Sequence, residues 1–396
     1  MKNLLIIGNA AENSFVEDIC HHLKQRIDYS DIISLKDFAN REFCPRFIWE
    51  EPNSPQEVGS RLAGKTVLIV STSGREYSRD ELSMRTFLIA RAAKDNGAEK
   101  VALLEPDLFY SAQDRGPRRE HGLAGLPRSE EDCKKFDGQP FSSRLYAELL
   151  KSSGVDRVIT VQNHSRGVEY LCRERFSGAF DNLLPYDLYA SYILNTDVVN
   201  PGNLVICAPD RGAQPYADGL AAALTKQRPG LVLSPLRMKK DRKSEYEVTI
   251  EADPESPLPL ESIQGKDVAV IDDMVRTGKT IVECCRLLKT AKPNRVVFFV
   301  THFESSREGR INMADPSVDE IVTTSTIPSI SNRDVQGRLR SKLVVLRLER
   351  WLANHILYRF CPDREPLGEP HYSEDISLKN PRWKGHPGPL FTQHWL

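Results

Sequence analysis

Residues 268–280 read Val-Ala-Val-Ile-Asp-Asp-Met-Val-Arg-Thr-Gly-Lys-Thr, and this stretch decides the fold. Val268 to Ile271 have the length and the β-branched content of a strand that is buried on both faces, as strands of parallel sheets are. After the loop, apolar residues recur at helical spacing: Ile281, Cys284, Cys285 and Leu288. The segment therefore predicts a strand, a polar loop and a helix, the repeating unit of a parallel α/β sheet.

The polar residues of this segment fall where an open α/β sheet binds its ligands, beyond the carboxyl ends of the strands. Asp272 and Asp273 follow the apolar run, and two carboxylates suit the vicinal hydroxyls of a sugar. Thr277, Gly278 and Thr280 can offer hydroxyl and N–H groups to a phosphate at the helix N-terminus. A P-loop is excluded, because the first glycine of that motif would fall at Asp273. We therefore predict a sugar-phosphate site; an acidic turn capped by threonine is the structural alternative.

Composition limits the classes of function. A chain of 396 residues predicts two or three domains. With 54 basic and 55 acidic residues the net charge is −1, which argues against nucleic-acid or membrane binding as the main activity. The eight cysteines form no C-x-x-C pair and fit a reducing compartment better than a disulfide framework. The first apolar run is too short for a signal sequence, and no run has transmembrane length, so we expect a cytoplasmic protein.

Strand and helix patterns alternate along the chain, which predicts parallel α/β layers in two halves. The first half has predicted strands at 4–7, 66–70, 101–104 and 158–161 and helices at 15–23, 82–93 and 142–150. The second half has predicted strands at 204–208, 268–271 and 296–300 and helices near 216–224 and 280–288. The halves are expected to meet near Gly167–Phe176. We therefore predict domains at 1–165 and 166–350, followed by residues 351–396.

Further motifs occur in the order found in one enzyme family. They are Tyr110-Ser-Ala-Gln-Asp-Arg115, Gln139–Leu145, Val158–Ser165, Pro185–Ala190, Ala208-Pro-Asp-Arg-Gly212 and Met238-Lys-Lys-Asp-Arg242. Each is weak alone, but together with residues 268–280, which resemble a PRPP-binding loop, they resemble the ribose-phosphate diphosphokinases (PRPP synthases) over about residues 1–348. The resemblance implies an α/β fold of two doubly wound phosphoribosyltransferase-like domains with parallel sheets.

The resemblance also implies a reaction: transfer of the β,γ-pyrophosphoryl group of ATP to the anomeric hydroxyl of ribose 5-phosphate, giving PRPP and AMP, with Mg²⁺. It makes Lys240 and Arg242 the catalytic residues, although their charged segment could instead be a solvated loop. It associates His164 and Asp210 with the metal, although a single histidine at a strand end is often structural. It further implies a homo-oligomer, either a dimer or a hexamer.

Substrate contacts follow from the same resemblance. Asp272 and Asp273 would hold the ribose hydroxyls, and the 5-phosphate would lie on the loop that contains Thr277, Gly278 and Thr280 together with Arg276 and Lys279. The residues assigned to ATP are Gln113, Asp114 and Arg115, with Phe38, Asn40 and Glu42 of a segment that reaches ATP from a neighbouring subunit. Phe38 would stack on adenine; a buried core phenylalanine is the alternative.

Several positions depart from the family pattern. Arg276 stands where the family has an acid and Lys279 where it has glycine, so the loop carries two added positive charges. Ala112 replaces an ATP-contacting arginine and Arg41 a glycine, and Asn163 also differs. These departures leave room for a diphosphokinase that acts on another ribose-5-phosphate ester or sugar phosphate. A phosphoribosyltransferase and a non-catalytic regulatory subunit of a synthase are the more distant alternatives.

Two segments lie outside the simple outline. Residues 116–138 are longer than the family's loop at this place and predict a mobile lid, with a passive insertion as the alternative. After Trp351 the prolines predict an extended C-terminal arm over residues 351–396 that lies on the body or on a neighbouring subunit. Three late aromatic residues, Trp383, Phe391 and Trp395, would anchor the arm; a disordered tail is the alternative.

Overall fold

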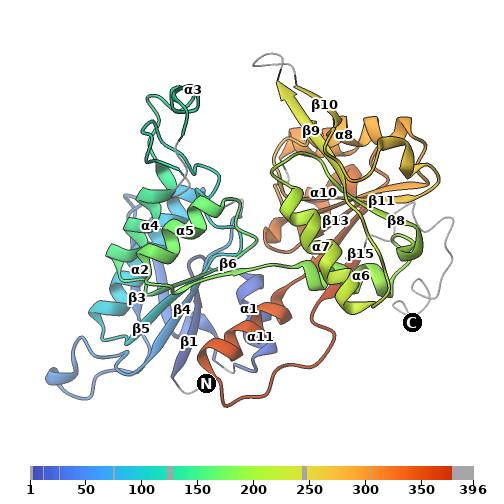
Figure 1. Ribbon diagram of the computed structural model, residues 1–396. Coiled ribbons are helices and arrows are strands. Elements are labelled where there is room, and N and C mark those ends of the chain that lie inside the picture. Colours follow the sequence, from blue (N-terminus) through green and yellow to red (C-terminus); the bar gives the residue numbers. More distant parts are fainter. Residues whose placement is uncertain are drawn as a thin grey trace. The chain divides into compact units, whose positions relative to one another are not determined.

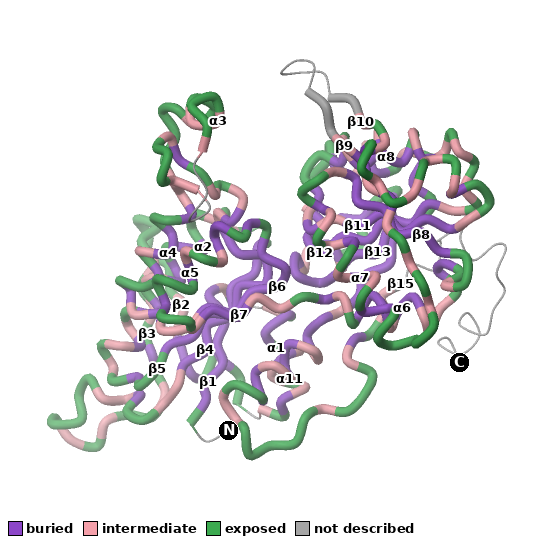
Figure 2. The backbone as a smooth tube through the Cα atoms, in the orientation of Figure 1, coloured by how far each residue is buried: buried purple, intermediate pink, exposed green. Residues whose placement is uncertain are grey.

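The structure is a computed structural model that describes residues 3–11, 13–25, 27–74, 76–122, 128–242, 248–304 and 306–376. The chain forms two compact units, one of residues 1–183 with 349–371 and one of residues 184–348 with 372–396 (Figure 1). In each unit the central strands of the main sheet are buried and the exposed residues lie mainly on helices and loops (Figure 2). Within the described ranges no helix combines the length and apolarity needed to cross a bilayer.

The first unit is built on a parallel sheet of five strands. Its strands follow one another across the sheet in chain order: β1 (Leu4–Gly8), β4 (Thr66–Val70), β5 (Lys100–Leu104), β6 (Arg157–Val161) and β7 (Phe180–Leu183). Its helices are α1 (Ser14–His22), α2 (Arg79–Asp95), α3 (Glu130–Lys134), α4 (Ser142–Ser153), α5 (Arg166–Arg175) and α11 (Glu349–Phe360). A separate hairpin joins β2 (Ile33–Asp37) to β3 (Phe43–Phe47).

The second unit contains a larger sheet with the strand order β10-β9-β8-β11-β12-β13-β14-β15. The strands are β8 (Leu204–Ala208), β9 (Leu236–Arg242), β10 (Val248–Ala252), β11 (Asp267–Val275), β12 (Arg295–Phe303), β13 (Glu320–Thr324), β14 (Leu343–Arg347) and β15 (Ser373–Ile376). The helices are α6 (Tyr186–Asn195), α7 (Gln214–Gln227), α8 (Lys279–Thr290), α9 (Arg307–Met313) and α10 (Arg333–Gln336). Because β9 lies on one side of β8 and β11 on the other, the strand order reverses at the β8–β11 pair. This reversal is the switch point of a doubly wound sheet, where such sheets bind ligands.

The α/β class and the parallel sheets predicted from the sequence are confirmed, and each predicted strand and helix overlaps an observed element. The helix after residues 268–280 buries the four predicted positions on its inner face, Ile281, Cys284, Cys285 and Leu288. The strand before it is longer than predicted, because β11 continues through the acids to Val275. The reversal of strand order is seen in the second sheet, whereas the first sheet keeps chain order.

The boundary between the units lies near residue 183, later than the predicted boundary at 165. Strand β7 pairs with β6, with Phe180 opposite Val158, and this pairing keeps α5 and β7 in the first unit. The sequence did not indicate β7, because Phe180–Leu183 is short and only half apolar.

The structure also differs from the predicted extended arm. Residues 349–360 form α11, which packs against α1 and buries Leu352, Ala353, Ile356 and Leu357. The prolines that suggested an arm all follow Phe360, so they end this helix rather than prevent it. Farther on, β15 pairs antiparallel with β14 in the second unit. Trp383, Phe391 and Trp395 lie outside the described residues.

A buried carboxylate fastens α11 to the first sheet. Asp181 of β7 is 7% exposed and accepts hydrogen bonds from Arg359 at 2.6 Å, Arg157 at 2.9 Å and His355 at 3.3 Å. Burial alone would raise the pKa of Asp181, but the hydrogen bond from His355 and the two guanidinium charges lower it to about 2. The C-terminal helix is therefore part of the first unit's framework.

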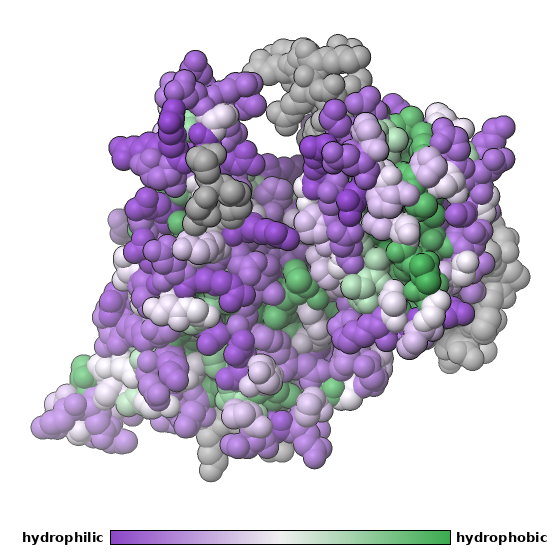
Figure 3. All heavy atoms as spheres, in the orientation of Figure 1, coloured by the Kyte–Doolittle hydropathy of each residue, from purple (hydrophilic) through white to green (hydrophobic). Residues whose placement is uncertain are grey.

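Most of the face visible in Figure 3 is hydrophilic, with smaller apolar areas between the hydrophilic residues. This agrees with the mean hydropathy of −0.42 for the whole chain.

Candidate active site

Three carboxylates meet at the switch point of the second sheet. Strands β8 and β11 are hydrogen-bonded neighbours, with Cys207 opposite Val270, so the residues that follow each strand emerge at the same edge. Asp210 follows β8, and Asp272 and Asp273 lie in the last part of β11. Burial raises the pKa of Asp272 well above its usual range, and the charges of Asp273 and Asp210 raise it further. The structure therefore brings together three acids that are predicted from separate motifs.

Tyr216 adds a phenol group to this acidic cluster. It lies in the first turn of α7, the helix that follows Asp210. Burial raises the pKa of Tyr216, and the nearby charges of Asp273, Asp272 and Asp210 act in the same direction. Tyr216 was not predicted as a site residue from the sequence. Its position one turn into the helix after Asp210 is the signal that could have indicated it.

The loop after β11 ends at the N-terminus of α8, where the sequence predicts a phosphate site. Gly278 has a φ of 76° and is the N-cap residue of α8, and no side chain caps this helix end. A β-carbon at Gly278 would also lie 2.8 Å from the sulfur of Met313, so a residue without a side chain is required. The first N–H groups of α8 and its positive dipole end are thus open to an anion. Thr277 is exposed and Thr280 half-buried at this end of the helix.

The two added cations of the loop have different surroundings. The Nζ atom of Lys279 is 2.9 Å from Glu308 of α9, and this hydrogen bond raises the pKa of Lys279. Arg276 is exposed, and within the described part of the chain its side chain has no ion pair. Arg276 is therefore the loop cation whose charge is not offset by a neighbouring carboxylate.

In the first unit, the segment Phe38–Glu42 is the turn of the β2–β3 hairpin. The turn is closed by the N–H of Phe38, which donates to the carbonyl of Glu42 at 2.8 Å, and by Asn40 Oδ1, which accepts from the N–H of Glu42 at 3.2 Å. Arg41 has a φ of 68°, a conformation suited to the glycine of the family pattern. Phe38 is 44% exposed, which excludes the alternative of a core phenylalanine.

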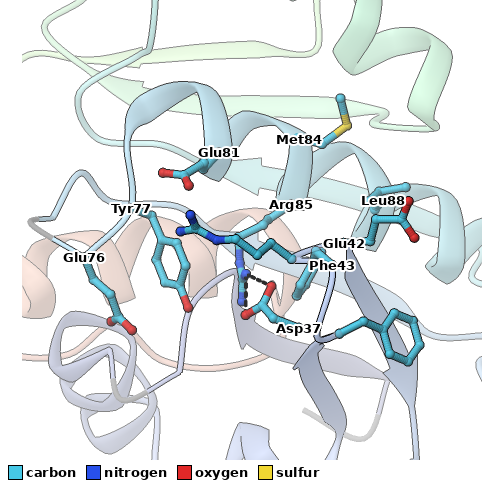
Figure 4. A pocket seen from close by; sticks show the side chains of 11 residues that line it. Asp37, Glu42, Phe43, Glu76, Tyr77, Glu81, Met84, Arg85 and Leu88 are labelled. Carbon is cyan, nitrogen blue, oxygen red and sulfur yellow. Dashed lines mark hydrogen bonds and ion pairs between the residues drawn. The ribbon is translucent and has the colours of Figure 1, made fainter.

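A pocket of about 730 Å³ lies between this hairpin and α2 (Figure 4). Arg85 lies against it, with its guanidinium carbon 3.8 Å from the ring centroid of Phe43 and 4.3 Å from that of Tyr77. The same guanidinium group forms an ion pair with Asp37 at 2.8 Å. Met84, also on the pocket wall, is 56% exposed. The hairpin turn therefore borders a hollow that has both apolar and charged walls.

The other segment assigned to ATP by resemblance, Gln113–Arg115, lies beside the loop that carries His164. Asp114 accepts a hydrogen bond of 2.6 Å from the hydroxyl of Ser165, the residue after His164. Gln113 accepts one of 2.6 Å from Ser142, and Arg115 pairs with Asp132 at 3.2 Å. His164 itself is exposed. The structure thus gathers the predicted Gln113, Asp114, Arg115 and His164 at one edge of the first sheet.

A buried acid that was missed in the sequence supports this edge. Glu105, at the end of β5, is fully buried and accepts hydrogen bonds from the N–H of Phe109 at 2.9 Å and the hydroxyl of Tyr146 at 3.0 Å. Desolvation raises the pKa of Glu105 to about 7. A single acid at the end of an apolar strand is the only sequence signal for this residue.

The predicted catalytic residues Lys240 and Arg242 belong to β9. In the antiparallel β9–β10 ladder they are opposite Ile250 and Val248, and β9 runs beside β8. Their side chains lie outside what the structure describes, so their catalytic role stays a prediction.

The insertion 116–138 is partly ordered around one arginine. Arg128 donates hydrogen bonds to the carbonyl of His121 at 2.6 Å and to the carboxylate of Asp132 at 2.7 Å, at the foot of α3. Residues 123–127 of this insertion lie outside the described ranges. Its role as a lid stays a prediction.

The chain's similarity to known proteins covers both units. A family model described as phosphoribosyl transferase domain matches residues 188–331, within the second unit. The chain is 28% identical over 341 residues to ribose-phosphate pyrophosphokinase 5 of Schizosaccharomyces pombe, which covers 83% of this chain and 88% of that protein. It is 25% identical over 327 residues to the ribose-phosphate pyrophosphokinase of Corynebacterium efficiens, with 83% of this chain and 85% of that protein covered.

The fold resembles that of the phosphoribosylpyrophosphate synthetase from Mycobacterium smegmatis. The TM-score is 0.67 at 23% identity, and the match covers 90% of this chain and 99% of that structure. The sequence matches extend over both α/β units, and the switch point of the second unit carries the acid pair and phosphate loop that resemble the family's motif. The chain is therefore similar, over most of its length, to the ribose-phosphate pyrophosphokinases (PRPP synthases), and its fold resembles that of a phosphoribosylpyrophosphate synthetase.

Proposed function

We propose that the protein is a ribose-phosphate diphosphokinase, which transfers the β,γ-pyrophosphoryl group of ATP to the anomeric hydroxyl of ribose 5-phosphate. The products are PRPP and AMP. The observation that carries this proposal is the crowded pair Asp272–Asp273 followed by the uncapped start of α8, at the switch point of a phosphoribosyltransferase domain. Carboxylates for sugar hydroxyls and N–H groups for a terminal phosphate are the two features that a ribose 5-phosphate site requires.

Two groups of residues in this segment bind different parts of the acceptor. Thr277, Gly278 and Thr280 bind the 5-phosphate through hydroxyl and N–H groups at the helix end. Asp272 and Asp273 accept hydrogen bonds from the 2- and 3-hydroxyls. Holding both ends of the sugar fixes the direction of the anomeric hydroxyl, and such alignment supplies much of the rate enhancement in phosphoryl-type transfers.

Mg²⁺ fits the charge of the acidic cluster. Asp210 and its neighbours Asp272 and Asp273 repel one another, as the raised pKa of Asp272 indicates, and a divalent cation would relieve this repulsion. The described residues contain no group of three or more side chains arranged to hold a metal ion by themselves. Mg²⁺ commonly keeps several waters and binds through one or two carboxylates and substrate phosphates, so Asp210 is proposed as a metal contact of the second unit. His164 is proposed separately as a metal-associated residue of the first unit. When bound, the ion would neutralise charge on the transferred group.

Lys240 and Arg242 are proposed to stabilise the pyrophosphoryl group during transfer. A guanidinium group holds two oxygens at once, and an ammonium group acts as a point charge. Their contribution would be larger in the transition state than in the ground state, because negative charge shifts onto the leaving oxygen only as the bond breaks.

ATP is proposed to contact two segments of the first unit. Gln113, Asp114 and Arg115 form one contact, and the hairpin residues Phe38, Asn40 and Glu42 reach the ATP of a neighbouring subunit. The exposure of Phe38 on a turn beside exposed Met84 supports a homo-oligomer, either a dimer or a hexamer. Light scattering coupled to size-exclusion chromatography measures the number of subunits.

All eight cysteines are free thiols, which supports a reducing compartment such as the cytoplasm.

A diphosphokinase that acts on a more anionic sugar phosphate is the second candidate. The observation that favours it is Arg276, an exposed cation on the phosphate loop whose charge has no carboxylate partner among the described residues. An acceptor with an additional anionic group near its 5-phosphate would use this charge.

Incubation with ATP, Mg²⁺ and a panel of sugar phosphates tests both candidates. Formation of AMP with ribose 5-phosphate supports the proposed function, and the product mass identifies the pyrophosphoryl ester. The matched control is the double variant Asp272→Asn with Asp273→Asn, which should form no AMP. Release of ADP instead of AMP would mean an ordinary kinase, and no reaction with any acceptor would refute diphosphokinase activity.

A further inference from the structure

The loop between β11 and α8, residues 276–278, is the phosphate loop of the proposed site, and it is held from one side by the segment that contains α9. The N–H of Glu304 donates a hydrogen bond to the carbonyl of Val275 at 3.1 Å. The hydroxyl of Ser306 donates one to the carbonyl of Arg276 at 3.2 Å. The side-chain amide of Asn312 donates one to the carbonyl of Thr277 at 2.8 Å. Three successive carbonyl groups are therefore fixed by one neighbouring segment of the same unit.

The direction of these carbonyls determines where the loop's N–H groups point. A trans peptide group is planar, with its N–H opposite its C=O. Since the carbonyls of Arg276 and Thr277 are held toward α9, the N–H groups of Thr277 and Gly278 point away from it. Neither of these N–H groups donates a hydrogen bond to any described residue. Two free donors on the side opposite the fixed carbonyls form an anion-binding surface.

The contact between the loop and α9 leaves no room for an additional methyl group. A β-carbon at Gly309 of α9 would lie 2.7 Å from the carbonyl oxygen of Arg276. The packing of Met313 against Gly278 continues the contact at the other end of α9. The ion pair between Lys279 and Glu308 also joins the loop end to α9, but both side chains are more than half exposed, so it contributes little.

We propose that Asn312 and Ser306 are positioning residues for the acceptor: by holding two carbonyl groups they keep the loop's N–H groups turned toward the 5-phosphate. Without these bonds the two peptide groups can rotate, and a carbonyl oxygen facing the phosphate would repel it. This inference rests on the proposed function of the loop as the 5-phosphate site. It assigns the positioning of this site to the segment between β12 and β13, which contains Ser306 and Asn312.

The test uses two uncharged changes on α9 and one control. Asn312→Leu removes the amide donor with little change of volume, and Gly309→Ala places a methyl group against the carbonyl of Arg276. Ile311→Ala is the control, because Ile311 is 63% exposed on the same helix. Ribose 5-phosphate binding is measured by calorimetry, the KM for ATP by steady-state kinetics, and amide hydrogen exchange over residues 276–282 by mass spectrometry.

We expect Asn312→Leu and Gly309→Ala each to weaken ribose 5-phosphate binding about tenfold and to speed amide exchange of the loop, with the KM for ATP within twofold. The melting temperature of Asn312→Leu should be unchanged. Asn312→Gln, which keeps an amide donor, should recover part of the affinity. The control should match the natural protein in every measurement. Unchanged exchange and affinity in Asn312→Leu, or equal losses for both substrates with a lower melting temperature, would overturn the positioning role.

Failure of the proposed function can be distinguished from failure of this inference. If the natural protein forms no AMP from ATP and ribose 5-phosphate, the proposed function is wrong. The positioning role is still decided by amide exchange of the loop and by calorimetry with inorganic phosphate, neither of which requires turnover. Faster exchange in Asn312→Leu but not in Ile311→Ala supports it, and equal exchange in the two variants refutes it.

Discussion

Replacing Glu105 by glutamine should stabilise the protein at pH 8 and not at pH 5. The carboxyl group is fully buried beside Phe109 and Tyr146, and burial raises its pKa from 4.5 to about 7. As pH rises from 4.5 to about 7, the unfolded chain releases a proton that the folded protein still holds. The free energy of unfolding therefore falls across this window and is constant above it.

The size of the effect follows from the two pKa values. A difference of about 2.5 pH units at about 1.4 kcal/mol per unit gives a loss on the order of 3 kcal/mol at pH 8. Glutamine at position 105 cannot ionise and keeps a carbonyl acceptor for the N–H of Phe109, at a cost of about 1 kcal/mol for a weaker bond. The net stabilisation of Glu105→Gln at pH 8 is then about 2 kcal/mol.

Thermal melting at pH 5, 6, 7 and 8 measures this effect. For a domain of this size about 2 kcal/mol corresponds to a rise of about 4–8 °C. The difference between Glu105→Gln and the natural protein should grow from zero or slightly negative at pH 5 to that value at pH 8. Glu99→Gln is the control, since Glu99 is exposed just before the same strand, and it should show no such trend. A difference that is the same at every pH would show that Glu105 is ionised throughout and would refute the reasoning.

Four further predictions concern the site. Asp272→Asn should abolish AMP formation yet raise the melting temperature at pH 8, because it removes one charge from a crowded cluster. Asp267→Asn on the same strand should lower the melting temperature, and shifts in the same direction for both variants would contradict this account. Lys240→Ala should lower kcat by about 10²–10³ with little change in ATP affinity, measured by steady-state kinetics, and a drop below about fivefold would leave Lys240 a surface residue. Arg276→Asp alone should change acceptor preference nearly as much as the double variant Arg276→Asp with Lys279→Gly, because Lys279 already pairs with Glu308. The kcat/KM value for each acceptor measures this preference, and an equal proportional loss for all acceptors would contradict the prediction. Chelation should abolish activity and millimolar Mg²⁺ restore it, whereas full activity after exhaustive chelation would exclude a metal requirement.

The parts of the site that could be predicted from the sequence are those fixed by local patterns. The apolar run before Asp272 and the helical spacing after Gly278 each depend on neighbouring residues, so the start of β11 and the bounds of α8 were predicted to within two residues, whereas β11 continues past the predicted end to Val275. Residues 38–42 were assigned to ATP by resemblance alone, and the hairpin that carries them was not predicted, because β2 and β3 are short and only partly apolar. Local patterning therefore predicted the structure of the segment assigned to the 5-phosphate better than that of the segment assigned to ATP.

The remaining features depend on contacts between segments distant in the chain. That Asp210 lies beside Asp272 follows only from the pairing of β8 with β11, and no local pattern encodes strand order. The helix α11 was missed because the prolines after Phe360 outweighed the apolar stripe before them. Asn312 gave no signal either, since its role comes from a single hydrogen bond to Thr277, 35 positions away.

Two acids at opposite ends of one strand show how a binding site can be recognised without reference to relatives. Asp267, at the start of β11, is buried, and its carboxylate accepts hydrogen bonds of 2.6 Å from both the N–H of Asn200 and the side chain of Asn294. Asp272, near the other end, is instead crowded by Asp273 and Asp210, and its pKa is raised. A buried acid that serves only the fold is expected to be surrounded by hydrogen-bond donors, as Asp267 is, rather than by other carboxylates, because a buried charge beside like charges is costly. The cluster at Asp272 is therefore an unfavourable arrangement in the free protein, and a cation or a sugar's hydroxyl groups are the ligands that would make it favourable.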